Sequence, residues 1–392
     1  MEYKSKKTAS GSVNRKNKSD SASKKFLLIG PKTDAVVNFR GDLIRDVKKK
    51  GYDVVVAVPE DNNKEFFKKN GVRVRIVNLK KNSLSAINAL AYQRALEKII
   101  REEKPDKVFS FTIKPVIFGS IAAKRAGVKE IYSLICGLGM LFCSDALKTR
   151  VLRVVGVELY KYALKFNKKV IFQNQYDIEE FVARKCVSRD KCELVNGSGV
   201  NLKKFKKNKI PVGEVSFLMV SRVIKEKGVM EYFEASRLVK EKYPKAKFAY
   251  IGAIDKNKNA IKLDALKPFI KDGTVDYIPE TKEVEKYVAK CSVFVLPTYY
   301  REGIPRTLLE ALAMGRPVIT TNTPGCRETI VEGKNGLFVK VKRADDLADK
   351  MIWMIKNKTK LQKMGDKSYQ MCLDKFTIEK IDARMLEIMG VE

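Results

Sequence analysis

The chain has 392 residues and a formal net charge of +33, from 79 Lys and Arg against 46 Asp and Glu. It contains no histidine, which excludes Ser-His-Asp and Cys-His catalysis and any histidine-ligated metal site. The cationic surplus indicates attraction to anions without choosing among nucleic acid, an acidic membrane face and phosphorylated substrates.

Residues 1–24 are rich in Lys, Ser and Asn and predict a disordered basic tail. No secretory apolar segment follows the start, and the longest apolar run, residues 132–143, is too short to span a bilayer. The seven cysteines form no C-x-x-C pair. These features predict reduced, mostly buried thiols in a cytoplasmic protein that is not integral to a membrane.

Short apolar runs alternate with helical patterns over residues 25–200. The run KFLLIG at 25–30 is followed by a helical stretch that closes at Gly51 and then by the strand-like YDVVVAVP. The alternation continues to KKVIFQN at 168–174. It predicts a doubly wound, Rossmann-like α/β domain over this range.

A second domain of the same kind is predicted over residues 214–373, where the alternation starts again. The turn-rich NGSGVN at 196–201 is a candidate hinge, and residues 201–213 form a basic linker. We expect residues 374–392 to form a helix that packs back on the N-terminal domain. The two domains would face each other across a cleft, with ligands at the carboxyl ends of the strands.

Two cations follow the first strand of the second domain, in the stretch SRVIKEKG. Arg222 comes directly after the strand VSFLMV, and Lys227 lies just before a predicted helix. Two cations beside a helix start suit a diphosphate. In a chain this basic, they are also compatible with an ordinary solvated surface.

The stretch REGIPRTLLEALAMGRPVITTN begins just after another apolar strand, VFVLPT. Pro305 favours a helix start, so we expect amides near residues 303–308 to be unpaired donors that can cradle phosphate. Glu302 precedes that helix and Glu310 lies inside it. Ionised carboxylates accept hydrogen bonds from sugar hydroxyls. The competing interpretation is an acidic first turn that complements the helix dipole.

Together these motifs resemble the retaining glycosyltransferases of family 4, which have the GT-B fold. The resemblance covers about residues 25–385 and extends to a bacterial branch that elongates lipid-linked glycans for capsules, O-antigens and glycoproteins. The motifs that carry it are SR-x4-KG, EGIPRTLLEALAMGRPVITT and PGCRE in the second domain, and VNFR, FTIKPVIFG, CGLG, FQN and GSGVN in the first.

This resemblance implies transfer of a hexose or N-acetylhexosamine from a nucleotide sugar, UDP-linked in the leading case, to a polyprenyl-diphosphate-linked glycan. Arg222 and Lys227 would neutralise the donor diphosphate, Glu302 would touch the donor sugar, and Glu310 would bind the nucleotide ribose. Backbone of the donor site would come from Gly303, Ile304, Arg306, Thr307 and Leu308. The residues that would face the acceptor or the donor phosphate are Gly30, Asn38, Arg40, Lys114 and Gly137.

The same resemblance implies no metal and no cofactor, because protein cations and helix amides would stabilise the leaving nucleoside diphosphate. Retention would follow from front-face attack, in which the departing phosphate takes the proton of the acceptor. Many family 4 enzymes carry a first-domain histidine near the reacting sugar. Here the IKP of residues 113–115 occupies the corresponding region, and the chain departs from the pattern.

A lipid-linked acceptor would lie in an anionic leaflet. Basic residues of the first domain and the helical pattern at 147–166 would hold the enzyme peripherally on the inner face of the cytoplasmic membrane. An ordinary packed helix with basic ends has the same pattern.

Other classes stay open. A nucleic-acid-binding protein fits the charge, but no zinc finger, RNP aromatic signature or helix-turn-helix pattern supports it, so we expect no nucleic acid partner. An epimerase or a glycosyltransferase with a soluble acceptor is also compatible. No G-x-G-x-x-G follows the first strand, which argues against a nicotinamide enzyme.

Overall fold

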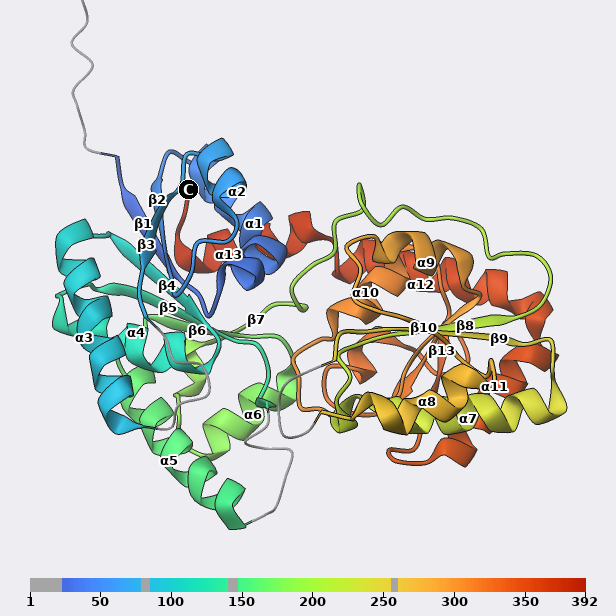
Figure 1. Cartoon of the computed structure of the whole chain (residues 1–392). Helices are drawn as coiled ribbons and strands as arrows, with labels where there is room; N and C mark the ends of the chain where they lie inside the picture. The colour runs from blue at the N-terminus through green and yellow to red at the C-terminus, as the bar shows by residue number, and fades with distance from the viewer. Residues whose placement is uncertain (1–22, 79–84, 140–146, 255–259) are drawn as a thin grey trace, which may run out of the picture.

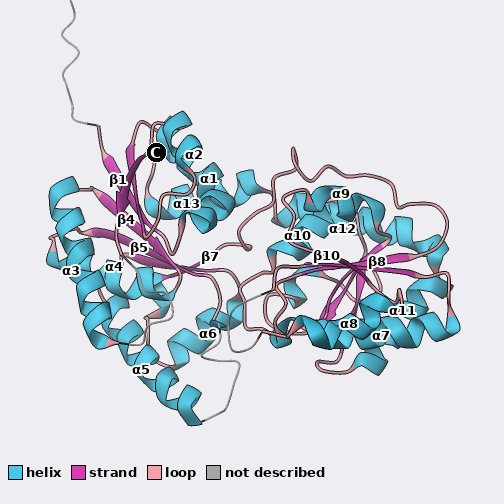
Figure 2. Ribbon diagram, viewed as in Figure 1, coloured by secondary structure: helices cyan, strands magenta, loops and turns pink. Residues whose placement is uncertain are grey.

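The computed structural model describes residues 23–78, 85–139, 147–254 and 260–392. The predicted basic tail up to residue 22, and Cys143 with the end of the longest apolar run, lie outside the described residues. Two parallel α/β sheets follow one another along the chain, and helices cover both faces of each (Figures 1 and 2). This confirms the predicted pair of doubly wound, Rossmann-like domains.

The first sheet has the strand order β3-β2-β1-β4-β5-β6-β7, with every pairing parallel. Strands β2 and β3 lie on one side of β1, and β4 to β7 lie on the other, so the strand order reverses between β1 and β4. Ligands bind at such a reversal in open α/β sheets. The strands are β1 (Lys25–Ile29), β2 (Asp53–Val58), β3 (Arg73–Ile76), β4 (Lys107–Phe111), β5 (Glu130–Ile135), β6 (Lys169–Phe172) and β7 (Cys192–Leu194). The helices are α1 (Thr33–Lys49), α2 (Lys64–Lys69), α3 (Ala86–Glu103), α4 (Ile113–Arg125), α5 (Leu147–Leu164) and α6 (Gln175–Ala183).

The second sheet has the order β10-β9-β8-β11-β12-β13, again parallel, and reverses between β8 and β11. The strands are β8 (Ser216–Val220), β9 (Lys247–Ile251), β10 (Asp276–Ile278), β11 (Val293–Leu296), β12 (Val318–Thr321) and β13 (Gly336–Val339). The helices are α7 (Val229–Lys242), α8 (Leu263–Lys271), α9 (Val284–Lys290), α10 (Arg306–Ala313), α11 (Ala344–Lys356), α12 (Leu361–Lys375) and α13 (Ile378–Met389), with the short 3-10 helix η3 (Lys225–Lys227).

Central and edge strands differ as their sequences require. All four residues of β11, VFVL, are fully buried because helices cover both faces of the sheet. The edge strand β3 instead carries Arg73 and Arg75, which both pair with the buried Glu103 of α3, at 2.8 and 2.6 Å. Charged side chains on an edge strand discourage pairing with other chains.

Helix α13 is the last helix of the chain, yet it packs with the first sheet (Figure 1). Its residues Met385 and Met389 are fully buried in the same apolar cluster as Phe26 of β1. The chain thus crosses between the sheets twice, and the two crossings lie side by side. Val200 N donates to Phe376 O at 2.9 Å, and Ile378 N donates to Val200 O at 3.0 Å.

Two further findings concern the membrane and the thiols. No helix among the described residues combines the length and the apolar character needed to cross a bilayer. Six of the seven cysteines lie in the described residues, and all six are free thiols.

The α13 packing leads to a test that separates the two cores. Met385→Ala should destabilise the first core by about 2–5 kcal/mol, the usual cost of truncating a fully buried Met. Met351→Ala, on α11, removes an equally buried Met from the second core. The single tryptophan, Trp353, lies on α11 and reports on the second core alone. In urea unfolding, Met351→Ala should shift the fluorescence transition, and Met385→Ala should shift mainly the far-UV circular dichroism. Equal fluorescence shifts would contradict separate cores.

Candidate active site

Two loops leave the same edge of the second sheet, at the carboxyl ends of β8 and β11. These strands are parallel neighbours at the point where the strand order reverses. Arg222 and Lys227 lie on the loop after β8, and Glu302 lies on the loop after β11. The fold therefore brings together three residues that the sequence analysis grouped.

The two loops are hydrogen-bonded into one unit. Glu226 O accepts from Tyr299 N at 2.8 Å, from Tyr300 N at 3.1 Å and from the Thr298 hydroxyl at 3.0 Å. Gly228 has a positive φ of 76°, and a Cβ there would meet Pro297 O at 2.3 Å. Only glycine allows the loops to approach this closely.

The two cations of this unit lie beside one aromatic ring, and one of them pairs with Glu302. Lys227 Nζ is 2.5 Å from Glu302 Oε1, and the two side chains are 11% and 19% exposed. The Tyr300 ring centre is 5.8 Å from Lys227 Nζ and 6.0 Å from the guanidinium carbon of Arg222. These distances allow cation–π attraction, which holds both cations at the mouth of the loops.

The Glu302 loop makes backbone contact with the first domain. Gly303 N donates to Cys136 O at 3.0 Å, and Gly139 N donates to Arg301 O at 2.7 Å. Gly137 has φ 115°, and a Cβ there would lie 2.5 Å from Gly303 N and 2.6 Å from the carbonyl carbon of Glu302. The predicted residues Gly137 and Gly303 thus meet across the domain boundary.

The amides near the start of α10 are only partly free. The helix begins at Arg306, directly after Pro305, close to the predicted position. However, Gly303 N is bonded to Cys136 O, and Leu308 N donates to Pro305 O at 3.1 Å. The prediction of unpaired donors is therefore wrong for Gly303 and Leu308 in this conformation. The Ile304 and Leu308 side chains are buried in the second core, so only their backbone can meet a ligand.

Glu310 lies one turn further along α10 and is largely buried. Its Oε1 is 3.1 Å from Arg306 Nε. Burial raises the pKa of Glu310, against the opposing charges of Arg306 and Lys204. Arg306 also donates to the Asn38 carbonyl, and its guanidinium carbon lies 5.2 Å from the Phe39 ring centre. This chain of contacts joins Glu310 to α1 of the first domain.

The sequence predicts that Arg40 faces the acceptor or the donor phosphate. In the structure its side chain instead extends from α1 into the interior, toward Met385 of α13. Its residue exposure is 1%, and burial lowers the pKa of its guanidinium. Asp382 of α13 is also 1% exposed, and burial raises its pKa to about 8 while the charge of Arg40 opposes this. Within the described residues, both Asp382 carboxylate oxygens and Arg40 Nε lack a hydrogen-bond partner. Arg40 cannot touch a ligand from solvent here.

Other predicted first-domain residues lie at the reversal point of the first sheet. Gly30 follows β1 and packs tightly, since a Cβ would meet Val36 at 2.4 Å. Lys114 follows β4 in the first turn of α4, and burial lowers the pKa of its amine. Thr112, just before that helix, has φ 69°, a strained backbone for a β-branched residue.

Three boundary residues were not predicted. Tyr300 lies on the loop after β11, and an aromatic residue at such a position does not by itself indicate a binding site. A Cβ on Gly303 would meet Gln173 Oε1 at 2.1 Å, and Asn174 Nδ2 lies 3.5 Å from Gly303 O. Gln173 and Asn174 belong to the FQN motif, which marked the resemblance but suggested no contact.

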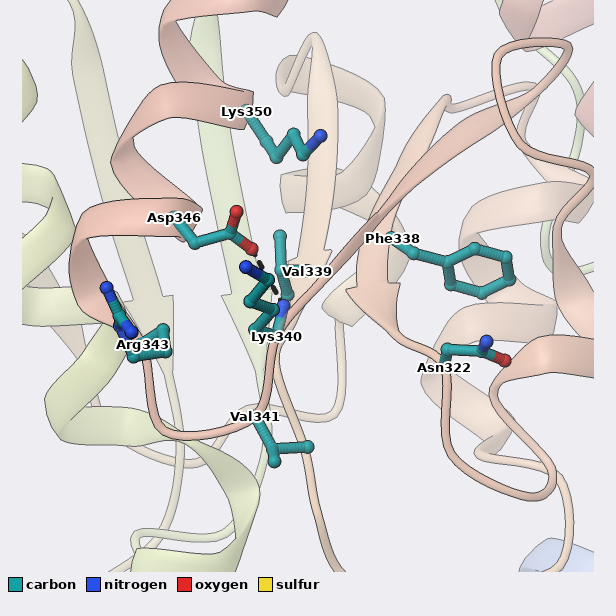
Figure 3. A pocket seen from close by; sticks show the side chains of 8 residues that line it. All are labelled: Asn322, Phe338, Val339, Lys340, Val341, Arg343, Asp346 and Lys350. Carbon is teal, nitrogen blue, oxygen red and sulfur yellow. Dashed lines mark hydrogen bonds between the residues drawn. The ribbon is translucent and has the colours of Figure 1, made fainter.

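A cavity lies elsewhere on the second domain (Figure 3). It measures about 590 Å³ and opens at the ends of β12 and β13 beside the start of α11. Two charged side chains that line it have partners nearby. The Asp346 carboxylate accepts a hydrogen bond from the backbone amide of Lys340 at 2.7 Å, and Arg343 pairs with Asp345. None of the predicted site residues lines it, so we place the candidate site at the domain boundary. The lining residues are Asn322, Phe338, Val339, Lys340, Val341, Arg343, Asp346 and Lys350.

Known families match both halves of the chain. Residues 27–174 match the family "Glycosyl transferase 4-like", and residues 200–371 match "Glycosyl transferases group 1". The chain belongs to the group 1, family 4-like glycosyltransferases. The first match spans β1 to β6 of this glycosyltransferase, and the second spans β8 to β13.

Individual relatives agree with this assignment. The glycosyltransferase is 29% identical over 340 residues to the N,N'-diacetylbacillosaminyl-diphospho-undecaprenol alpha-1,3-N-acetylgalactosaminyltransferase of Campylobacter jejuni, covering 82% of this chain and 87% of the relative. It is 23% identical to the UDP-Gal:alpha-D-GlcNAc-diphosphoundecaprenol alpha-1,3-galactosyltransferase of Escherichia coli, covering 77% and 79%. The structure of Anabaena Alr3699/HepE in complex with UDP and glucose superposes with a TM-score of 0.75 at 16% identity, over 93% and 99%. This likeness establishes the GT-B fold.

The boundary contact predicts a strong effect of one methyl group. Gly137→Ala should reduce the transfer rate of the glycosyltransferase by about 100-fold, because displacing the Glu302 loop by an ångström is enough for such a loss. Gly139→Ala is the matched control: it also has a positive φ, but among the described residues the one atom near its Cβ would be the Tyr300 hydroxyl at 3.6 Å. Initial rates and melting temperatures of both variants test this. Equal losses would show that loop strain, not the boundary contact, is responsible.

Asp382 predicts a pH dependence of stability. The pKa of Asp382 in the folded protein, about 8, lies above its ordinary value of 3.8. The contribution of Asp382 to the free energy of unfolding is therefore fully present below pH 3.8 and is lost as the pH rises through about 8. Asp382→Asn removes this titration. The stability of the wild type relative to the variant should therefore fall between about pH 5 and pH 9 in urea unfolding. The exposed Asp349→Asn is the control, and parallel pH profiles for wild type and Asp382→Asn would contradict the inference.

Proposed function

We propose that this glycosyltransferase moves a hexose or N-acetylhexosamine from a UDP-sugar to a polyprenyl-diphosphate-linked glycan, with retention at the anomeric carbon. The observation that carries the proposal is the pair of cations Arg222 and Lys227 beside Tyr300, with Lys227 paired to Glu302 on a loop in backbone contact with the first domain. The Campylobacter and E. coli relatives support the acceptor class, since both are named for diphospho-undecaprenol substrates.

The donor diphosphate would bind by exchanging ion pairs. Lys227 is paired with Glu302 in the structure. A diphosphate placed beside Arg222 and Lys227 offers the lysine a stronger anionic partner, because it carries more charge than a carboxylate. Glu302 would then be released to accept hydrogen bonds from the hydroxyls of the donor sugar. The carboxyl group of Glu310, beside Arg306, would accept hydrogen bonds from the ribose hydroxyls.

The proposed chemical step needs no base from the protein, because the leaving phosphate takes the proton of the acceptor. The bond between the anomeric carbon and the leaving phosphate oxygen breaks, and the acceptor hydroxyl oxygen bonds to that carbon from the same face. The acceptor proton passes to the departing phosphate oxygen. Arg222 and Lys227 would stabilise the negative charge that develops on the nucleoside diphosphate, the usual role of preorganised cations. We propose that these cations take the part that a divalent metal plays elsewhere.

We place the enzyme peripherally on the inner face of the cytoplasmic membrane, where a lipid-linked acceptor and a cytosolic nucleotide sugar would meet. The net charge of +33 supports attraction to an anionic leaflet. A soluble acceptor is the main alternative within the same family. Comparing membrane extracts with soluble oligosaccharides as acceptors, for one labelled UDP-sugar, decides between them.

Two substitutions test the site. Arg222→Ala and Glu302→Ala should each lower kcat by roughly 100-fold or more, as loss of one charge-stabilising group does in other enzymes. Arg237→Ala is the control, since this arginine lies on α7 and pairs with Asp272 at 3.2 Å, away from the candidate site. Melting temperatures with and without UDP separate catalytic loss from unfolding. Full transfer by the Arg222 or Glu302 variant would overturn the assignment.

A further inference from the structure

Helix α5 leaves an apolar stripe exposed on the outside of the first domain. Its inner face, including Val157 and Tyr160, is buried against α4 and β6. The outer face carries apolar side chains with exposures between 36% and 64%. In Figure 1 this helix lies at the lower outer edge of the first domain, below α4. The α5 stripe consists of Val151, Val154, Val155, Leu159 and Tyr162.

Cations flank the stripe. Arg150 and Lys165 are exposed near its two ends, and Lys165 Nζ lies 5.9 Å from the Tyr162 ring centre. One carboxylate, Glu158, lies within the stripe and pairs with Lys161 at 2.6 Å. An apolar helix face bordered by cations is the pattern of helices that lie in a bilayer interface.

A cavity of about 480 Å³ opens beside the same helix. Four lysines line it: Lys161 and Lys165 from α5, and Lys185 and Lys191 from the segment that follows α6. Lys191 Nζ donates to the Lys165 carbonyl at 2.8 Å, which fixes one wall. Among the described residues that line the cavity, none is a carboxylate. The cavity therefore suits an anion.

We propose that the α5 stripe and the four-lysine cavity form one docking surface for an anionic bilayer. The stripe enters the interface between headgroups and acyl chains, and the cavity takes the phosphate of an anionic phospholipid. The inference extends the proposed function, because it names the surface that would hold the enzyme beside a lipid-linked acceptor. It does not rest on the identity of the sugar.

Two other occupants of the docking surface, a second copy of the chain and the N-terminal tail, are disfavoured because they are basic like the surface itself. A second copy of the chain, related by a two-fold axis, would place the cations that border the stripe of one copy opposite the cations of the other, and like charges repel. The basic N-terminal tail, residues 1–22, carries six Lys or Arg against two acids and offers no complementary charge. An anionic lipid surface complements both the cations and the stripe.

Vesicle binding tests the proposal with the full chain. Cosedimentation is measured with phosphatidylcholine vesicles, alone or with roughly one third phosphatidylglycerol. Binding should require the anionic lipid. Lys165→Gln/Lys185→Gln and, separately, Val154→Ser/Val155→Ser should each weaken it by about tenfold or more. The controls are Lys358→Gln/Lys367→Gln, on exposed second-domain lysines, and Val212→Ser, on a fully exposed valine of the linker.

The outcomes separate this proposal from the proposed function. Unchanged melting temperatures and UDP-induced shifts would show that the variants fold and keep the donor site. Equal binding to neutral and anionic vesicles, or wild-type binding by both test variants, would overturn the docking surface. A wild-type dimer that the valine variant dissociates would assign the stripe to a second copy instead. Absence of sugar transfer by the wild type, with vesicle binding intact, would overturn only the proposed function.

Discussion

The backbone contact between the Glu302 loop and the loop after β5 is the constraint on which the candidate site depends. Three glycines make it possible, because each stands where a Cβ would collide with main-chain or buried atoms. Gly137 faces Gly303 N, Gly303 faces Gln173, and a Cβ on Gly325 would lie 1.5 Å from Gly303 O. The loop is therefore enclosed on both sides by backbone. Its position is set by the approach of the two domains rather than by side-chain packing alone.

The two carboxylates of the REGIPRTLLE segment have a physical explanation in this arrangement. Neither is isolated: Glu302 pairs with Lys227 and Glu310 pairs with Arg306. In a chain with net charge +33, these pairs hold each carboxylate next to a cation. A diphosphate and its sugar then replace partners that are already oriented. This reduces the reorganisation that binding requires.

The sequence predicts the strands and the helix starts that local chemistry determines. Apolar runs such as VFVL, and Pro305 before α10, could be interpreted because their environment is encoded within a few residues. The interior position of Arg40 could not, because it is created by α13, which returns from the far end of the chain. The same holds for Gly303 N and Tyr300. Their partners, Cys136 O and the two cations, become neighbours only in the folded chain.

The paired crossings at Val200 and Thr377 have a consequence for biosynthesis. The apolar core around β1 includes Met385 and Met389, so it is incomplete until α13 has left the ribosome. During translation the second domain is finished first, although it is encoded later. The N-terminal half must wait, with part of its apolar surface uncovered, until α13 arrives. A fragment that ends at the linker would therefore lack one wall of its own core.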